Sequence, residues 1–225
     1  MAKRTKLRDR ILPDYTRGEE IMNMVTHIVG GGIGVIATIL CVVVGILRHN
    51  VWGIVTGAIY GVTMILLYTF SSIYHGLRTG TAKKVFQVID HCTIFLLIAG
   101  TYTPISLCSL REYNAWLGWI IFSVVWAVAI LGIVLNAIDL KKYKIFSMIC
   151  YLAMGWCIIV AIKQTFAAVG LAGCLWLIIG GVLYTIGAIL YGFGKKVRYF
   201  HSVFHIFVVL GTTAQLICIL FYVIE

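Results

Sequence analysis

Seven long apolar stretches, separated by short segments rich in lysine and arginine, constrain the fold of this chain more than any other feature. An α-helix needs about 20 apolar residues to cross the hydrocarbon core of a bilayer. Only 12% of the residues are charged, about half the share found in soluble domains, so a soluble globular protein is excluded. The predicted spans are residues 21–47, 51–75, 85–108, 114–136, 145–162, 171–193 and 199–223.

The sequence therefore predicts an all-α, polytopic membrane protein built as a seven-transmembrane helix bundle. The bundle occupies residues 21–225 and follows a basic cytoplasmic N-terminal segment at residues 1–20. The loops between spans are short, so no soluble domain is inserted. No cleavable signal peptide is expected, because the first 20 residues are polar and basic and lack a short apolar core. These features favour a multi-pass protein of a bacterial cytoplasmic membrane.

The positions of the basic residues predict the orientation of the bundle. All but three of the 18 lysines and arginines lie in the N-terminal segment or in the second, fourth and sixth loops, and the exceptions are Arg48, Arg111 and Lys163. Basic loops favour the cytoplasmic side of a membrane. We therefore expect the N-terminus in the cytoplasm and the C-terminus outside. The net charge of +10 reflects this bias, and nucleic acid is not expected as a partner.

Polar side chains at the inner ends of the spans identify a candidate site. Ionisable groups in hydrocarbon are costly, so each one is a functional hypothesis by default. Asp90 is the only charged residue that lies clearly within a predicted span, about one turn into the third. His75 ends the second span, and His201 and His205 open the seventh. With the predicted orientation, all four residues lie at a similar depth near the cytoplasmic face.

The spacing of the histidines is typical of a metal site. His201 and His205 are four residues apart, so both imidazoles project from one face of a helix. His75 from another helix would complete a three-histidine site with one open position, as in catalytic zinc sites. The spacing alone also allows other metals that bind imidazole, and it allows a packed or interfacial histidine pair without metal.

Two further side chains suit hydrolysis at such a centre. Three neutral ligands leave the charge of zinc undiluted, so the pKa of a bound water falls to about 7. Asp90 would orient that water and take its proton. Ser71, four residues before His75, would donate to the water or to a developing oxyanion. The alternative for Asp90 is a simple pairing with Lys84 or His91.

Six motifs fall in order in six of the seven predicted spans. They are GEEIMNMVTHIVGGGIG at 18–34, SSIYH at 71–75, IDHCTIFLLIAGTYTP at 89–104, YLAMGW at 151–156, GGVLYTIGAILYG at 180–192 and HSVFH at 201–205. With these motifs the chain resembles the hemolysin III branch of the progestin and adipoQ receptor family, within a larger group that includes the alkaline ceramidases. The resemblance covers nearly the whole chain, and Ser-x3-His, Asp and His-x3-His are specific in combination.

The resemblance implies seven helices, a cytoplasmic N-terminus and a zinc ion, Zn2+, held near the inner face. Carried over onto the matching positions of this sequence, the zinc ligands are His75, His201 and His205. Asp90 would contact the water on the metal, and Ser71 would lie beside it.

Four more polar residues in or near the motifs have no fixed role. Glu20 and Asn23 match the family's Glu-x2-Asn at the start of the first helix. They are as well suited to a hydrogen bond between helices as to catalysis. His27 lies further along the first helix, and His91 follows Asp90; neither has an assigned role.

Three functions stay open on the sequence. The first is an intramembrane zinc hydrolase, a ceramidase-like lipid amidohydrolase or esterase acting near the cytoplasmic face; the resemblance suggests the lipid amide. The second is a pore-forming or channel-like hemolysin linked to cytolysis, for which the spans offer few polar residues. The third is a receptor-like sensor of membrane state with a structural zinc; a structural zinc normally has four protein ligands, so Asp90 as a fourth ligand would favour this function. A membrane lipid, as substrate or ligand, is the expected partner; the sequence indicates no protein partner and no oligomeric state.

Overall fold

The computed structural model describes residues 4–194 and 197–225, and these residues form helices, turns and short irregular segments without any strand. The all-α prediction is thereby confirmed. Three of the basic residues expected on the inner side lie outside the described residues: Lys3, Lys195 and Lys196. The helices are η1 (Leu7–Asp9), α1 (Arg17–Leu47), α2 (Val51–Gly76), α3 (Thr81–Pro104), η2 (Ile105–Leu110), α4 (Arg111–Tyr113), α5 (Ala115–Asp139), α6 (Lys144–Trp156), η3 (Cys157–Ala161), α7 (Ile162–Phe193), α8 (Phe200–Cys218) and η4 (Ile219–Ile224).

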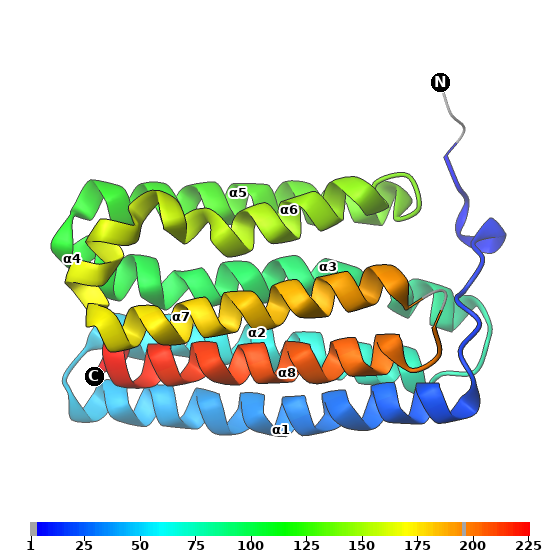
Figure 1. Ribbon diagram of the computed structural model, residues 1–225, viewed down its shortest axis with the longest axis horizontal. Helices are drawn as coiled ribbons and strands as arrows, with labels where there is room; N and C mark the ends of the chain where they lie inside the picture. Colours follow the sequence, from blue (N-terminus) through cyan, green and yellow to red (C-terminus); the bar gives the residue numbers. More distant parts are fainter. Residues whose placement is uncertain (1–3, 195–196) are drawn as a thin grey trace.

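Six helical stretches of the described chain are long and apolar enough to cross a membrane. The long helices lie roughly parallel in a bundle (Figure 1). α1 shows how its residues suit this place, because it buries small residues such as Gly34 and Ala37 and exposes large ones such as Ile36 and Ile39. An apolar outer surface is what hydrocarbon solvates. The six stretches are Arg17–Leu47, Val51–Gly76, Thr81–Tyr113, Ala115–Asp139, Lys144–Phe193 and Phe200–Ile224.

The fifth and sixth predicted spans fall in the single stretch Lys144–Phe193, which folds back on itself (Figure 1). The Trp156 indole N–H donates to the Thr185 hydroxyl at 3.0 Å. These residues are 29 positions apart, which is about 44 Å in a straight helix. Gly170 interrupts α7 with non-helical angles of φ 68° and ψ −178°, and it lies between the two predicted spans. Seven crossings and the orientation of the termini remain predictions.

The first helix begins earlier than predicted. α1 starts at Arg17, inside the segment 1–20 that the sequence assigns to the cytoplasmic tail. The reason is a capping box, in which the Thr16 hydroxyl accepts from the Glu19 N–H and the Glu19 carboxylate accepts from the Thr16 N–H. Such a box satisfies two of the free donors at a helix start. Glu20 therefore lies on the first turn of a helix rather than in a tail.

Glycines hold α1 and α2 close together. A Cβ on Gly57 would lie 2.6 Å from the Cβ of Cys41, and one on Gly61 would lie 2.0 Å from the hydroxyl of Thr38. Small residues at such faces let two helix backbones approach closely. This contact fixes the position of α1 relative to α2, and both helices carry residues of the candidate site.

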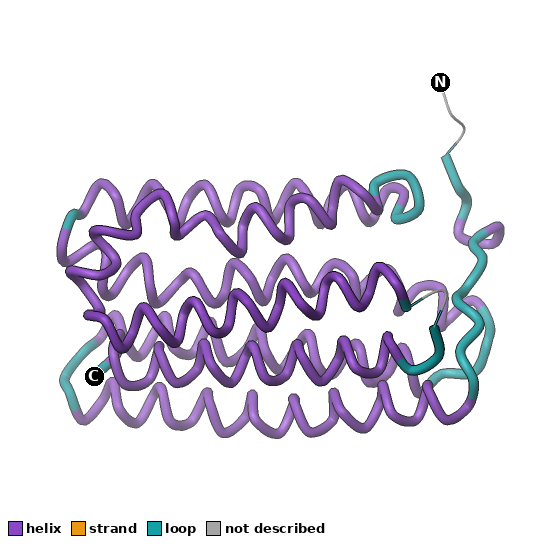
Figure 2. Tube along the Cα trace, in the orientation of Figure 1, coloured by secondary structure: helices purple, strands orange, loops and turns teal. Residues whose placement is uncertain are grey.

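The residues before α1 cross one end of the bundle as a strap, defined here as residues 4–16. Figures 1 and 2 show this segment running from the side of α5 and α6 to the start of α1. The Arg4 side chain donates to the Ile138 carbonyl at 2.8 Å, and the Thr5 N–H donates to Asp139 at 2.7 Å. Lys84 of α3 donates to the Arg8 carbonyl. The strap thus covers the end at which α2 finishes and α8 begins.

Candidate metal centre

Three histidines meet at the strap-covered end of the bundle. His75 lies in the last turn of α2, and His201 and His205 lie in the first two turns of α8. One ring nitrogen from each lies within 4.8 Å of the others, and all three side chains are buried. The His201 and His205 Nε2 atoms are 3.1 Å apart. The sequence prediction that these three side chains converge is therefore matched by the geometry.

The three side chains fit a metal ion. Nitrogens bound to one zinc at about 2.0–2.1 Å lie roughly 3–4 Å from one another, close to the spacing found here. His75 Nε2 is buried and has no hydrogen-bond partner among the described residues. An unpaired buried nitrogen costs roughly 1–3 kcal/mol, and an ion bound by its lone pair would remove that cost. The cluster is able to hold a metal, although its geometry does not select zinc.

α1 orients two of the three rings. His75 Nδ1 lies 2.7 Å from a Glu20 carboxylate oxygen and 3.3 Å from the Asn23 amide nitrogen. His205 Nδ1 lies 3.3 Å from the Asn23 carbonyl oxygen. A ring whose Nδ1–H donates to an oxygen leaves the Nε2 lone pair for a metal. The roles that the sequence left open for Glu20 and Asn23 are thus contacts that hold the histidines.

The Glu20 carboxylate has a second partner in Lys83. The Lys83 ammonium lies 2.7 Å from the other Glu20 oxygen and also donates to the Leu77 carbonyl at 2.9 Å. Lys83 is almost fully buried in the first turn of α3. In the sequence Lys83 resembles any other basic loop residue, because no local pattern links it to Glu20, which lies 63 positions earlier.

Asp90 and Ser71 line a cavity beside the histidines. His201 and His205 line the same cavity. The Ser71 hydroxyl is buried close to the Asp90 carboxylate. Asp90 is not part of the group of ligand atoms within 4.8 Å, which consists of the three histidines in the part of the chain that the structure describes.

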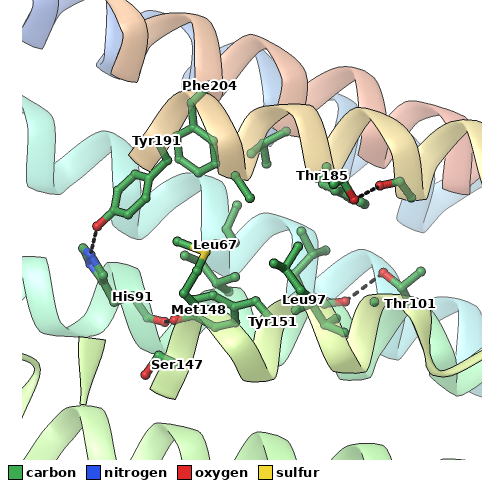
Figure 3. A pocket seen from close by; sticks show the side chains of 18 of the residues that line it. Leu67, His91, Leu97, Thr101, Ser147, Met148, Tyr151, Thr185, Tyr191 and Phe204 are labelled. Atoms are coloured by element: carbon green, nitrogen blue, oxygen red, sulfur yellow. Dashed lines mark hydrogen bonds between the residues drawn. The ribbon is translucent and has the colours of Figure 1, made fainter. Parts of the chain in front are cut away.

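Asp90 pairs with His91 rather than with Lys84, the two partners that the sequence suggested. A carboxylate oxygen of Asp90 lies 3.5 Å from His91 Nδ1, whereas the Lys84 ammonium donates to the Arg8 carbonyl. His91 Nδ1 also lies 2.8 Å from the Gln87 carbonyl oxygen, and His91 Nε2 lies 3.3 Å from the Tyr191 hydroxyl. His91 is therefore held on the cavity wall by its own helix and by α7 (Figure 3).

The cavity has a volume of about 160 Å³ and is lined mainly by apolar side chains. Figure 3 shows Leu67, Leu97, Met148 and Phe204 around it. Its lining runs from Asp90 on α3 to Ile105 at the start of η2, a distance of about 22 Å at 1.5 Å per residue. Asp90, Ser71 and two of the histidines line one end, and the remainder is mainly apolar, with Thr101, Thr185 and Gln215 among its few polar residues.

The strap closes the site at the end of the bundle. The Tyr15 ring stacks on His201 with centroids 4.9 Å apart and planes 16° apart. Burial raises the pKa of the Tyr15 phenol well above its ordinary value of 10, so the ring stays neutral. The Tyr199 N–H at the start of α8 donates to the Glu19 carboxylate at 2.8 Å. Sequence patterns gave no sign of Tyr15, because an aromatic residue in a basic tail has no distinctive spacing.

A fourth histidine lies against the three. The His27 ring stacks on His205 with centroids 3.8 Å apart and planes 13° apart, and its edge meets Tyr68 at 5.0 Å. His27 is buried, and neither of its ring nitrogens has a partner among the described residues.

Comparison with known proteins agrees with this architecture. A family model described as Haemolysin-III related matches residues 15–216, a range that includes every candidate site residue. The chain is 36% identical over 211 residues to the Hemolysin-3 homolog of Bacillus subtilis (strain 168), which covers 94% of this chain and 97% of that protein. It is 37% identical over 206 residues to Hemolysin-3 of Bacillus cereus, with 92% of each covered. It is 25% identical over 168 residues to the Monocyte to macrophage differentiation factor of Homo sapiens, with 72% and 68% covered.

Proposed function

The chain belongs to the haemolysin III family and is a multi-pass protein of the cell membrane, and we propose that it is a zinc-dependent hydrolase of a lipid amide or ester near the cytoplasmic face. The observation that carries this proposal is the convergence of three histidine nitrogens beside an apolar cavity lined by Asp90 and Ser71. Metal ligands, an acid–base group and an apolar binding site together are the parts that lipid hydrolysis needs.

Zinc, when bound, supplies a Lewis acid that polarises a carbonyl group and makes water more acidic. The protein's own contribution begins with three imidazoles, one nitrogen of each lying within 4.8 Å of the others. Glu20 and the Asn23 carbonyl hold two of these rings by their Nδ1 atoms. Partners of this kind fix the orientation of a ligand ring and raise its basicity.

Asp90 is the proposed general base. Its carboxylate lies on the cavity wall, which His201 and His205 also line. His91 Nδ1 lies 3.5 Å from one carboxylate oxygen, and the other oxygen can accept a proton from the attacking water. A positioned base contributes roughly 10²–10⁴-fold to a rate. Ser71, on the same wall, would donate its hydroxyl to the oxygen on which negative charge develops.

The apolar channel supports a lipid as the substrate. Its lining extends about 22 Å along α3 and the start of η2. For comparison, the acyl chains of one bilayer leaflet occupy about 15 Å of hydrocarbon. An acyl chain lying along the channel brings its carbonyl group to the polar end. A lipid enters such a site from the membrane, which agrees with the strap that covers the end of the bundle.

Two alternatives have less support. A pore needs a continuous polar path, whereas the cavity wall is mainly apolar. A sensor with a structural zinc needs four protein ligands, whereas the cluster of described residues offers three histidines and leaves Asp90 outside it.

The test combines metal content with lipid hydrolysis in purified protein. Wild-type protein should contain zinc and release fatty acid from a panel of N-acyl lipids and glycerolipids, detected by mass spectrometry. His205→Ala should lose both zinc and activity. Asp90→Asn should keep the zinc and lose activity by about 10²-fold or more. His49→Ala, in the exposed turn before α2, is the matched control and should behave as wild type.

Two results would contradict the proposal. Full activity of Asp90→Asn with zinc retained would remove Asp90 from the role of base. A zinc-loaded wild-type protein that releases no fatty acid from any lipid of the panel would refute the hydrolase itself.

A further inference from the structure

His27 is a histidine with unused hydrogen-bonding capacity inside a ligand-sized cavity. Its side chain is 4% exposed, lines the cavity, and has no partner at either ring nitrogen among the described residues. A neutral imidazole offers one N–H donor and one acceptor, and leaving either unmet in a buried place is costly. His91 lines the same cavity but has partners at both nitrogens. Of the two, only His27 has ring nitrogens free to contact a ligand.

The stacking of His27 argues against a role as a fourth metal ligand. The lone pair of an imidazole nitrogen lies in the plane of the ring, so a bound ion lies near that plane. The rings of His27 and His205 are tilted by only 13° with centroids 3.8 Å apart. An ion in the plane of His205 lies outside the plane of His27. The group of converging ligand atoms accordingly contains His75, His201 and His205 without His27.

His27 is placed to contact a ligand that enters the cavity. It lies on α1 against His205 and Tyr68, and Ser71 lies one turn after Tyr68 on α2. Ser71 also lines the cavity, with its hydroxyl buried close to Asp90. Two buried groups that can donate, one from each of two packed helices, thus border the same end of a mainly apolar channel.

We infer that His27 is a ligand-contacting residue whose ring N–H donates a hydrogen bond to the carbonyl oxygen of an acyl lipid in the cavity, beside the metal rather than on it. This inference rests on the proposed acyl ligand. Stacking on His205 holds the donor ring at a fixed distance from the metal ligands. The carbonyl group is therefore held next to the position where an ion would act on it.

Isotope-edited infrared spectroscopy tests the contact directly. The probe is N-methyldodecanamide labelled with carbon-13 at the carbonyl, added to the full-length purified protein in detergent. A hydrogen bond lowers the carbonyl stretching frequency. Wild-type protein should show a band below that of the probe in detergent alone. His27→Phe keeps an aromatic ring on His205 but has no donor, so the band should rise and probe affinity should fall about tenfold.

Metal content is the second readout. His27→Phe should retain the metal-to-protein ratio of wild type, because the ring is not a ligand. His27→Gln, which keeps a donor, should preserve part of the frequency shift. Leu47→Phe, at the exposed last residue of α1, is the control. If His27→Phe loses its folded gel-filtration profile, His27→Met replaces it and must show the same rise in frequency.

Three results would overturn the inference, and they differ from one another. An unchanged band and affinity in His27→Phe would exclude the contact while leaving the proposed hydrolase intact. Loss of metal in folded His27→Phe would make His27 a ligand. Failure of the wild-type protein to bind the probe would refute the acyl-binding cavity, and with it both this inference and the proposed substrate class.

Discussion

Glu20 is a single carboxylate that connects three helices. It lies on α1, faces His75 of α2 with one oxygen and Lys83 of α3 with the other, each at 2.7 Å. Hydrogen bonds to charged groups contribute about 1.5–3 kcal/mol, and the contacts here are partly buried. The same contact stabilises the fold and fixes the tautomer of a metal-binding ring.

Replacement of Glu20 by glutamine tests its effect on the metal-binding ring of His75. Glu20→Gln keeps the shape of the side chain but removes its charge, so metal affinity should fall about 10–100-fold, the usual effect of losing a partner of a ligand histidine. Competition with a chelator of known affinity measures the change. Glu112→Gln, exposed at the opposite end of the bundle, is the control. Equal metal affinities of Glu20→Gln and wild type would show that the carboxylate does not act on His75.

At the scale of helices, the packing of α1 on α2 determines whether these contacts form. Gly61 faces Thr38, whose hydroxyl already donates to the Gly34 carbonyl at 2.7 Å. A methyl group at this position meets a side chain that cannot move without losing that bond. The distance between α1 and α2 is therefore set by the lack of a side chain at Gly61.

Gly61→Ala should destabilise the bundle by roughly 1–3 kcal/mol, as overpacking of a tight contact does. Resistance to denaturation in a detergent titration measures the loss. Gly32→Ala is the matched control, because a Cβ on Gly32 has nothing within 4 Å, and alanine also has the higher helix propensity. If both variants are as stable as wild type, the close approach at Gly61 does not limit the packing.

The sequence predicted helices well where hydrophobicity decides their extent, and poorly where tertiary contacts do. The start of α2 at Val51 and the shared depth of His75 with His201 follow from charge and spacing. The fold-back at Gly170 also lies where a gap between spans was predicted. The stacking of His27 on His205 could not be predicted, because the two residues are far apart in the chain and no periodic pattern pairs them.

On the scale of the whole molecule, the strap joins the two sides of the bundle across one end. Asp139 of α5 accepts hydrogen bonds from the N–H groups of Thr5, Lys141 and Lys142, while Tyr15 lies on His201 of α8. Neither apolar core cluster of the described residues contains a strap residue, and Ile11 of the strap is 90% exposed, so the strap is a natural place for local opening.

Removal of the Tyr15 ring should expose the histidines to water. Tyr15→Ala is expected to lose its metal to a chelator several-fold faster than wild type, with little change in thermal stability, because stacking on His201 is a local contact. Stopped-flow fluorescence with a metal-sensitive dye measures the rate. Tyr113→Ala, exposed near α4, should release metal at the wild-type rate. Identical rates for Tyr15→Ala and wild type would show that the strap does not control access.

The ligands of the candidate centre are divided between α2 and α8, so more than half of the chain separates His75 from His201. During translation, the second helix leaves the ribosome long before its partners have been made. An ion can therefore be captured by all three imidazoles only after α8 has been inserted and has packed against α1 and α2. Metal occupancy then reports that membrane insertion is complete, since partly synthesised chains lack two of the three donors.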